Sequence, residues 1–198
     1  MKYISYLIFF VFIGLLLLFL KNALEPKKDE AVITGSEKCG ECHGLKNIGN
    51  QNAVWKNSAH SKAYNSLLST KAKEFNSANS LASPEKEEKC LGCHTTEFFL
   101  KGTGKHEAYN ITEGVGCEAC HGAGSNYSPA QVMKDKGAFE REGGILGDER
   151  VCLKCHSPKG NKEGIMKNDA CPFQQNDFNY KNALEKIKHP VDKDFKYQ

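Results

Sequence analysis

Four short motifs in this chain combine two thiols and an imidazole at one fixed spacing. Each reads Cys-x-x-Cys-His: CGECH at 39–43, CLGCH at 90–94, CEACH at 117–121 and CLKCH at 152–156. Pairs of this kind hold zinc, form disulfides or attach heme, and only heme attachment requires a histidine directly after the second cysteine. With 7 histidines in 198 residues, chance would place one after all four pairs with a probability on the order of one in a million. The pattern therefore predicts four c-type hemes.

Each motif supplies two covalent anchors and one axial nitrogen. The thiols add to the vinyl groups of the porphyrin as thioethers, and the adjacent imidazole binds the iron as its proximal ligand. The predicted anchors are Cys39, Cys42, Cys90, Cys93, Cys117, Cys120, Cys152 and Cys155. The predicted proximal ligands are His43, His94, His121 and His156.

Three histidines outside the motifs are candidates for the second axial position. His60 falls on the apolar stripe of a predicted helix, with Trp55 and Tyr64 nearby. His189 ends another predicted helix and precedes a proline, whereas His106 lies in a loop rich in glycine and lysine. Three spare imidazoles for four irons predict three six-coordinate hemes and one with an open or unusual sixth position.

Methionine is the other common axial ligand of c-type heme. Met133 and Met166 are available for that role, but we expect both to be packing residues. The ninth cysteine, Cys171, has no partner at attachment spacing and is expected to be a free or buried thiol.

Composition is in keeping with a chain built around prosthetic groups. Hydrophobic residues make up 39% of the sequence, which is low for a domain that must form its own core. Nine cysteines are typical of secreted or metal-bearing chains. The net charge of +3 comes without a long basic block, so nothing supports nucleic-acid binding. We expect the apolar faces of the hemes to replace much of the missing core.

An uncharged apolar run occupies residues 3–20. As a helix it would reach ~27 Å, close to the ~30 Å hydrocarbon core of a membrane. Cleaved signals have a shorter apolar region and a small-residue cleavage site. We therefore expect an uncleaved anchor over residues 1–20, with a cleaved signal and a soluble periplasmic protein as the alternative.

Orientation follows from the heme chemistry. Three lysines just after the apolar run oppose an outward C-terminus. Covalent heme attachment in bacteria, however, takes place outside the cytoplasmic membrane. We therefore place the heme domain on the periplasmic side of that membrane.

Organisation along the rest of the chain is mainly helical with long irregular loops. Residues 21–35 are polar and predict a tether, followed by a tetraheme domain over 36–198. Helices are expected over 53–69 and 179–188, and from Ser83 with Pro84 in its first turn. Residues 101–116 are expected to form a loop.

Several of these stretches together resemble the tetraheme cytochrome c-554 (c-prime) family. VWKNSAHSKAY, CLGCHT, GVGCEACHGAGS, CLKCH and KHPV occur in the order that the family shows, over about residues 36–191. The resemblance implies a mostly helical protein with hemes in stacked pairs. It also implies distal ligation by His60 and His189 and a five-coordinate heme at His94.

One departure from the family pattern follows the third motif. Relatives carry a distal histidine in Cys-His-Gly-Pro-Gly-x-x-His, where this chain has Ala123 for the proline and Tyr127 for the histidine. Either His106 takes over this role, or the first or second heme is bound differently. We expect Tyr127 to be a pocket residue and not a ligand.

Function follows from the same resemblance. The type member of the family carries electrons away from hydroxylamine oxidoreductase in nitrifying bacteria. We expect this chain to transfer electrons between a periplasmic oxidoreductase and a membrane or periplasmic acceptor, as a carrier and not as an enzyme. The alternatives are reduction of nitric oxide or a related nitrogen oxide at a five-coordinate heme, and a structural role in a larger respiratory complex.

Overall fold

The computed structural model describes residues 30–156 and 178–189. The described residues from Ala31 onward fall in one compact unit. The predicted anchor, Met166 and Cys171 lie outside the described residues. Among the residues that are described, no helix is long and apolar enough to cross a membrane.

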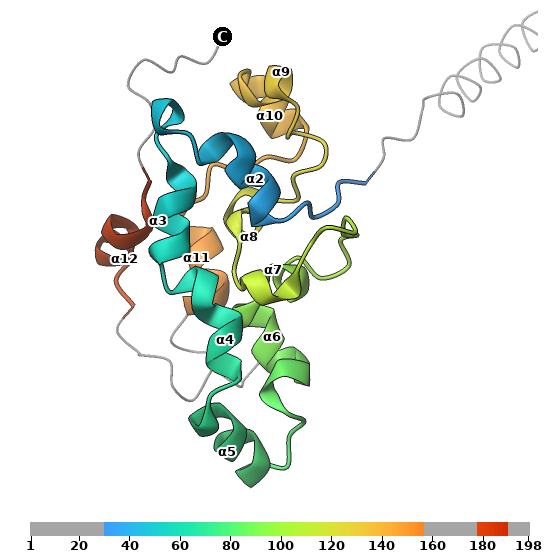
Figure 1. Ribbon diagram of the computed structural model, residues 1–198, viewed down its shortest axis with the longest axis vertical. Helices are drawn as coiled ribbons and strands as arrows, with labels where there is room; N and C mark the ends of the chain where they lie inside the picture. The colour runs from blue at the N-terminus through green and yellow to red at the C-terminus, as the bar shows by residue number, and fades with distance from the viewer. Residues whose placement is uncertain (1–29, 157–177, 190–198) are drawn as a thin grey trace, which may run out of the picture. The chain divides into compact units, whose positions relative to one another are not determined.

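Short helices joined by irregular loops make up the fold, which confirms the mainly helical prediction (Figure 1). The one β pairing in the described ranges is a single parallel bridge between Ile33 and Lys105. The α-helices are α2 (Ser36–His43), α3 (Gln51–Asn57), α4 (Ala63–Leu67), α5 (Thr70–Ala78), α6 (Glu88–His94), α7 (Thr96–Phe99), α8 (Cys117–His121), α9 (Ala130–Met133), α10 (Lys136–Arg141), α11 (Glu149–His156) and α12 (Tyr180–Ile187). The 3-10 turns are η1 (Lys46–Ile48), η2 (His60–Lys62), η3 (Pro84–Lys86) and η4 (Ile111–Glu113).

Each Cys-x-x-Cys-His motif lies on a helix that ends at its histidine. This holds for α2, α6, α8 and α11. Residues three and four apart share one face of a helix, so both thiols and the imidazole of a motif project to the same side. The short helix α8 contacts both α2 and α7, the helix that follows the second motif.

The helix predicted over 53–69 is wrong as a continuous element. It divides into α3, η2 and α4, and Ser58 between them is extended. The hydroxyl of Ser58 accepts the His60 backbone N–H at 3.2 Å, a local bond that competes with helical pairing. The His60 carbonyl instead accepts the N–H of Val115 at 3.0 Å. The break therefore ties the backbone of His60 to a distant segment.

Two other helix predictions differ in outcome. The helix expected from Ser83 begins later, because Pro84 opens only the 3-10 turn η3 and α6 starts at Glu88. The helix expected over 179–188 is confirmed as α12, whose first turn is capped by the Asn179 side chain accepting the N–H of Asn182 at 3.0 Å.

The segment expected to be a tether enters the folded unit before its predicted end. Ile33 is fully buried, its N–H donates to the carbonyl of Gly104 and its carbonyl accepts the N–H of His106, each at 2.8 Å. The predicted boundary at residue 36 thus falls inside the fold, because backbone pairing with the 104–106 loop holds Ile33, an apolar residue near the end of the expected tether.

Few hydrophobic side chains are buried in the described part of the chain. They are Ile33, Leu67, Leu91, Ala119, Tyr127 and Phe139. Burial of apolar surface is the main driving force for folding, so a core this small needs additional apolar material. This agrees with the expectation that porphyrin rings complete the interior.

Candidate heme sites

The proximal imidazoles are oriented by hydrogen bonds at Nδ1. In His43 this nitrogen lies 3.3 Å from Gln51 Oε1, in His94 it lies 2.8 Å from the Ala63 carbonyl oxygen, and in His121 it lies 2.7 Å from the Ile145 carbonyl oxygen. An acceptor at Nδ1 keeps the proton there and leaves Nε2 as the free electron pair for a metal. Three of the four proximal histidines are therefore in the tautomer that an axial ligand requires.

Two distal candidates lie opposite proximal imidazoles. The ring centroids of His60 and His156 are 6.0 Å apart, and those of His121 and His189 are 5.9 Å apart. With a nitrogen–metal bond of about 2 Å on each side, two imidazoles sharing one metal have centroids about 6 Å apart. The structure thus brings His60 to the fourth motif and His189 to the third at the separation that one iron between each pair requires.

Burial keeps these paired imidazoles neutral. It lowers the pKa of His60, His121, His156 and His189 below the ordinary value. The facing imidazole lowers the pKa of His60 and His189 further, and His43 lowers that of His121 and His189. Only the neutral ring can bind a metal through nitrogen. The lowered pKa values of these histidines therefore favour binding of a metal by the neutral rings.

His106, the third distal candidate, is not brought to any proximal imidazole. Its side chain is exposed, and its Nδ1 accepts the N–H of Ala108 at 3.1 Å. All seven histidines are within the described residues, and the ring contacts among them join His60 to His156 and His121 to His189. His43 and His94 face no second imidazole.

Cysteines of different motifs lie close together in pairs, and their thiols mark where thioether sulfurs would stand. A hydrogen bond with Cys117, together with burial, raises the pKa of the Cys39 thiol. A hydrogen bond with Cys93, together with burial, raises the pKa of Cys155. Burial and then the nearby Cys152 raise the pKa of Cys120 to about 11.

These three mutual effects of the thiols on their pKa indicate which motifs are neighbours in space. The first motif adjoins the third through Cys39 and Cys117, the third adjoins the fourth through Cys120 and Cys152, and the fourth adjoins the second. The spatial order is first, third, fourth, second. The spacing of the motifs along the sequence does not contain this order.

A segment over residues 113–118, which we call the hub segment, joins the surroundings of several motifs. The Thr96 hydroxyl accepts the N–H of Gly116 at 2.8 Å and ties α7, just after the second motif, to the hub. The Ser36 hydroxyl accepts the N–H of Cys117 at 3.0 Å and ties α2 to it. The carbonyl of Val115 accepts the indole N–H of Trp55 at 2.8 Å.

Glu118 anchors the N-terminal strand-like segment to the third motif. Its side chain is 1% exposed, and its carboxylate accepts the backbone N–H groups of Thr34, Gly35 and Gly124 at 2.6–3.1 Å. The Thr34 hydroxyl donates to it as well, at 3.1 Å. A buried carboxylate is stable only when its oxygens are satisfied in this way.

Two glycines beside the third motif permit close backbone approach. Gly114 has φ +80°, and a Cβ there would lie 2.6 Å from the His60 carbonyl oxygen. Gly122 has φ +82°, and a Cβ there would lie 2.6 Å from the Gly143 carbonyl oxygen. Both positions require glycine, because protein backbone passes beside them.

Tyr127 is a packing residue, as expected. It is 5% exposed, its hydroxyl donates to the Gly122 carbonyl at 2.7 Å, and its ring packs edge-on against Phe139 at 4.9 Å between centroids. Burial and then the charge of Glu118 raise its pKa, so the phenol keeps its proton.

The residues present fit heme c at these motifs. The imidazole tautomers and the separation of the facing pairs are those of axial ligands, and none of the eight motif cysteines is in a disulfide. The Ile145 side chain, 45% exposed beside His121, offers an apolar wall for a porphyrin. Across the described residues, no three His, Cys, Asp or Glu side chains gather as they would around a zinc ion.

Several supporting groups could not be found from the sequence. The carbonyls that orient His94 and His121 belong to Ala63 and Ile145, and any residue type provides a carbonyl. Phe178, stacked on His156 with centroids 4.7 Å apart, is likewise unmarked by any motif. Gln51 is eight residues from His43, and only its place at the start of α3 brings it close.

The chain is similar to known proteins in sequence and in fold. Cytochrome c-554 of Nitrosomonas europaea is 36% identical over 119 residues, which cover 58% of this chain and 48% of the relative. The chain thus matches about half the length of that curated relative. The solved structure of reduced cytochrome c554 from Nitrosomonas europaea superposes with a TM-score of 0.55 at 25% identity, covering 82% of this chain and 86% of that one.

Helical motifs with paired imidazoles define a multiheme c-type cytochrome. Residues 38–122 match the family described as cytochrome c554 and c-prime. Over these residues the chain is similar to that family, and the solved structure extends the likeness in fold to most of the chain.

Proposed function

We propose that this chain is a four-heme electron carrier in which the hemes are connected in the order first, third, fourth and second motif. Two observations support the proposal: cysteines of successive motifs are near enough to shift each other's pKa, as in Cys39 with Cys117, Cys120 with Cys152 and Cys93 with Cys155, and helix α2 of the first motif contacts α8 of the third. Cysteine sulfurs sit at the porphyrin edge, so neighbouring sulfurs imply neighbouring hemes. When bound, heme c supplies reversible one-electron chemistry.

The side chains and backbone around the motifs set the conditions for that transfer. Acceptors at Nδ1 of His43, His94 and His121 fix the rings and raise their basicity as ligands. Paired neutral imidazoles favour six-coordinate iron, which changes little in geometry between its two redox states. Burial excludes water and so shifts the potential of each site. The described residues would thus position the hemes and tune their potentials, as an electron carrier requires.

Reversible potentiometry tests this function. We expect four electrons per chain, taken up and returned without loss, in steps spread out by interaction between neighbouring sites.

EPR of the oxidised protein tests the proposed order of the hemes, since adjacent irons broaden each other's signals. Removing the fourth site with Cys152→Ser and Cys155→Ser should sharpen the signal of the second.

A matched variant removes a site that does not adjoin the second motif. Cys39→Ser with Cys42→Ser should leave the signal of the second site broadened, because the first motif adjoins the third. If both double variants act equally on the second site, the proposed order is wrong.

We propose further that the carrier works on the periplasmic side of the cytoplasmic membrane and exchanges electrons with protein partners there. The apolar run over residues 3–20 supports an N-terminal anchor. Membranes of expressing cells washed with alkaline carbonate should retain the heme protein, and a variant lacking residues 1–20 behind a cleavable signal should be released. Full release of the unaltered protein would favour the cleaved alternative.

A second candidate function rests on His94. No imidazole faces it, so a small nitrogen oxide could be reduced at the second motif. Steady consumption of nitric oxide by the reduced protein, abolished in a Cys90→Ser, Cys93→Ser variant, would support catalysis there. We rank it second, because the described surroundings of His94 include backbone and the Ser66 hydroxyl but no acid positioned for proton delivery.

A further inference from the structure

The seven histidines of this chain leave two motifs without a second imidazole. Four are proximal, and two of the remaining three face His156 and His121. His106 is exposed and its Nδ1 is engaged by the N–H of Ala108. Both His43 and His94 therefore lack a histidine opposite them. The resemblance to the family implies a five-coordinate heme at His94 but not at His43. The missing imidazole opposite His43 is therefore a feature that the family pattern does not explain.

Tyr127 stands where the family pattern has a distal histidine, and it belongs to the neighbourhood of the first motif. The third motif cannot use this position, because His189 already faces His121. After burial and Glu118, both Cys39 of the first motif and Cys117 of the third raise the pKa of Tyr127, and the helices α2 and α8 that carry these cysteines contact one another. The loop over 122–127 lies beside the first and third motifs. It could therefore supply a second axial ligand only to the first.

The hydroxyl of Tyr127 is held away from a ligand role. It donates to the carbonyl of Gly122 within its own loop at 2.7 Å, and Phe139 fixes the ring. Iron binds tyrosine as the phenolate, and burial beside Glu118 opposes loss of the proton. The residue fills space as a neutral phenol.

We propose that no histidine of this chain, and no side chain of its described residues, takes the sixth position opposite His43, because Tyr127 replaces the distal histidine and is locked to Gly122. The first motif then joins the second as a binding site for a small neutral diatomic ligand such as carbon monoxide or nitric oxide. This inference rests on the proposed four-heme function.

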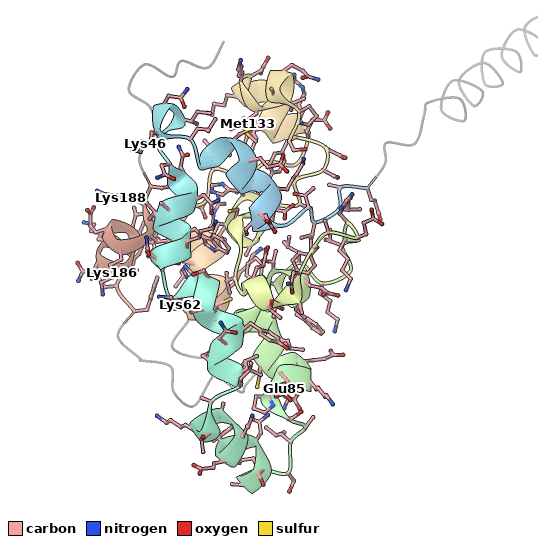
Figure 2. All side chains as sticks on the ribbon, in the orientation of Figure 1. Lys46, Lys62, Glu85, Met133, Lys186 and Lys188 are labelled. Carbon is pink, nitrogen blue, oxygen red and sulfur yellow. The ribbon has the colours of Figure 1, made fainter. Side chains whose placement is uncertain are left out.

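Met133 is the competing ligand that the test must exclude. It ends α9, in the helical corner formed with α10, and its side chain is half-buried (Figure 2). A thioether from α9 would make the first site six-coordinate. Coordination by Met133 would overturn the proposal.

The test begins with the number of hemes per chain. This number tests the proposed four-heme function separately from the proposed open position opposite His43. A pyridine hemochrome assay that finds four hemes per chain supports the proposed function whatever the ligands are. The fully reduced protein is then titrated with carbon monoxide. We expect two equivalents bound per chain and two high-spin sites by magnetic circular dichroism. One equivalent, or none, overturns the proposal while leaving the four-heme function intact.

Substitutions at position 127 identify the second site. Tyr127→His restores an imidazole to the loop, and we expect carbon monoxide binding to fall from two equivalents to one with loss of one high-spin signal. Tyr127→Phe keeps the ring against Phe139 without offering a ligand, and should still bind two. A folded Tyr127→His protein that binds two equivalents overturns the assignment of this loop to the position opposite His43.

Two further variants exclude the other candidate ligands. His106→Ala and Met133→Leu should each still bind two equivalents, with the circular dichroism of the helices unchanged. A third equivalent in either variant would show that its side chain is an axial ligand, and this would overturn the proposed ligand assignment.

Discussion

The indole N–H of Trp55 donates to the carbonyl oxygen of Val115 at 2.8 Å, while the N–H of Val115 donates to the carbonyl of His60 at 3.0 Å. One residue of the hub segment, Val115, thus holds both sides of the chain break that brings His60 to His156. The proposed distal ligand of the fourth motif is therefore positioned by the segment that leads into the third.

Trp55→Phe should weaken this arrangement. The variant keeps an aromatic ring but leaves the Val115 carbonyl without its donor, which costs about 1–2 kcal/mol in the free energy of unfolding. Urea unfolding followed by circular dichroism measures that loss. An unchanged free energy of unfolding would contradict a stabilising role for the bond.

Gly114→Ala should disturb the same site more strongly. The new Cβ would meet the His60 carbonyl at 2.6 Å, at a backbone φ of +80° that costs about 1–2 kcal/mol for any other residue. We expect both a loss of stability and a new high-spin signal, because the backbone that carries His60 must move.

Gly102→Ala is the matched control for that variant. Gly102 has φ +88° but nothing within 4 Å of its Cβ position. Gly102→Ala should lower the free energy of unfolding through its backbone conformation, without producing the high-spin signal. Equal spectra for the two variants would mean that contact with His60 is not the cause.

Glu118→Gln should destabilise the fold by several kcal/mol. The amide cannot accept all the N–H groups that the buried carboxylate accepts from Thr34, Gly35 and Gly124, and its own NH2 would face those donors. Glu41→Gln serves as control, since its pair with Lys38 is exposed and worth less than about 1 kcal/mol. Similar losses in the two variants would contradict the anchoring role of Glu118.

Stability should depend on pH through Glu113. Burial raises its pKa above 4.5, with Glu118 and Glu37 adding repulsion against bonds from Ser36. The folded state therefore binds this proton more tightly than the unfolded state, and stability falls as pH rises from about 4.5 through the raised value. Glu113→Gln should remove that fall, so the variant gains stability relative to the unaltered protein as pH rises. A constant difference between the two across pH would contradict the shift.

The motifs could be predicted because their chemistry is local. Two thiols and an imidazole within five residues specify covalent attachment, and a helix places all three on one face. His60 and His189 could be proposed as distal ligands for a similar reason, since few histidines remain and both adjoin helical segments. His106 could not be separated from them, because its exposure follows from the pairing of its backbone with Ile33.

Long-range backbone bonds account for what the sequence did not predict. The break at Ser58, the packing of residues 31–35 and the role of the hub segment all depend on partners more than 40 residues away. Periodicity in the sequence detects neighbours along one element and contains no record of such partners. The order of the motifs in space likewise depends on long-range partners and could not be predicted from the sequence.

The central claim is that the four Cys-x-x-Cys-His motifs each carry a covalent heme. Mass spectrometry of the denatured protein, produced with the heme-attachment machinery, tests it most directly. We predict a mass increase of four heme groups, falling to three when either cysteine pair Cys117–Cys120 or Cys152–Cys155 is replaced by serine. A protein that folds and carries no covalent heme, or fewer than four, would contradict the account.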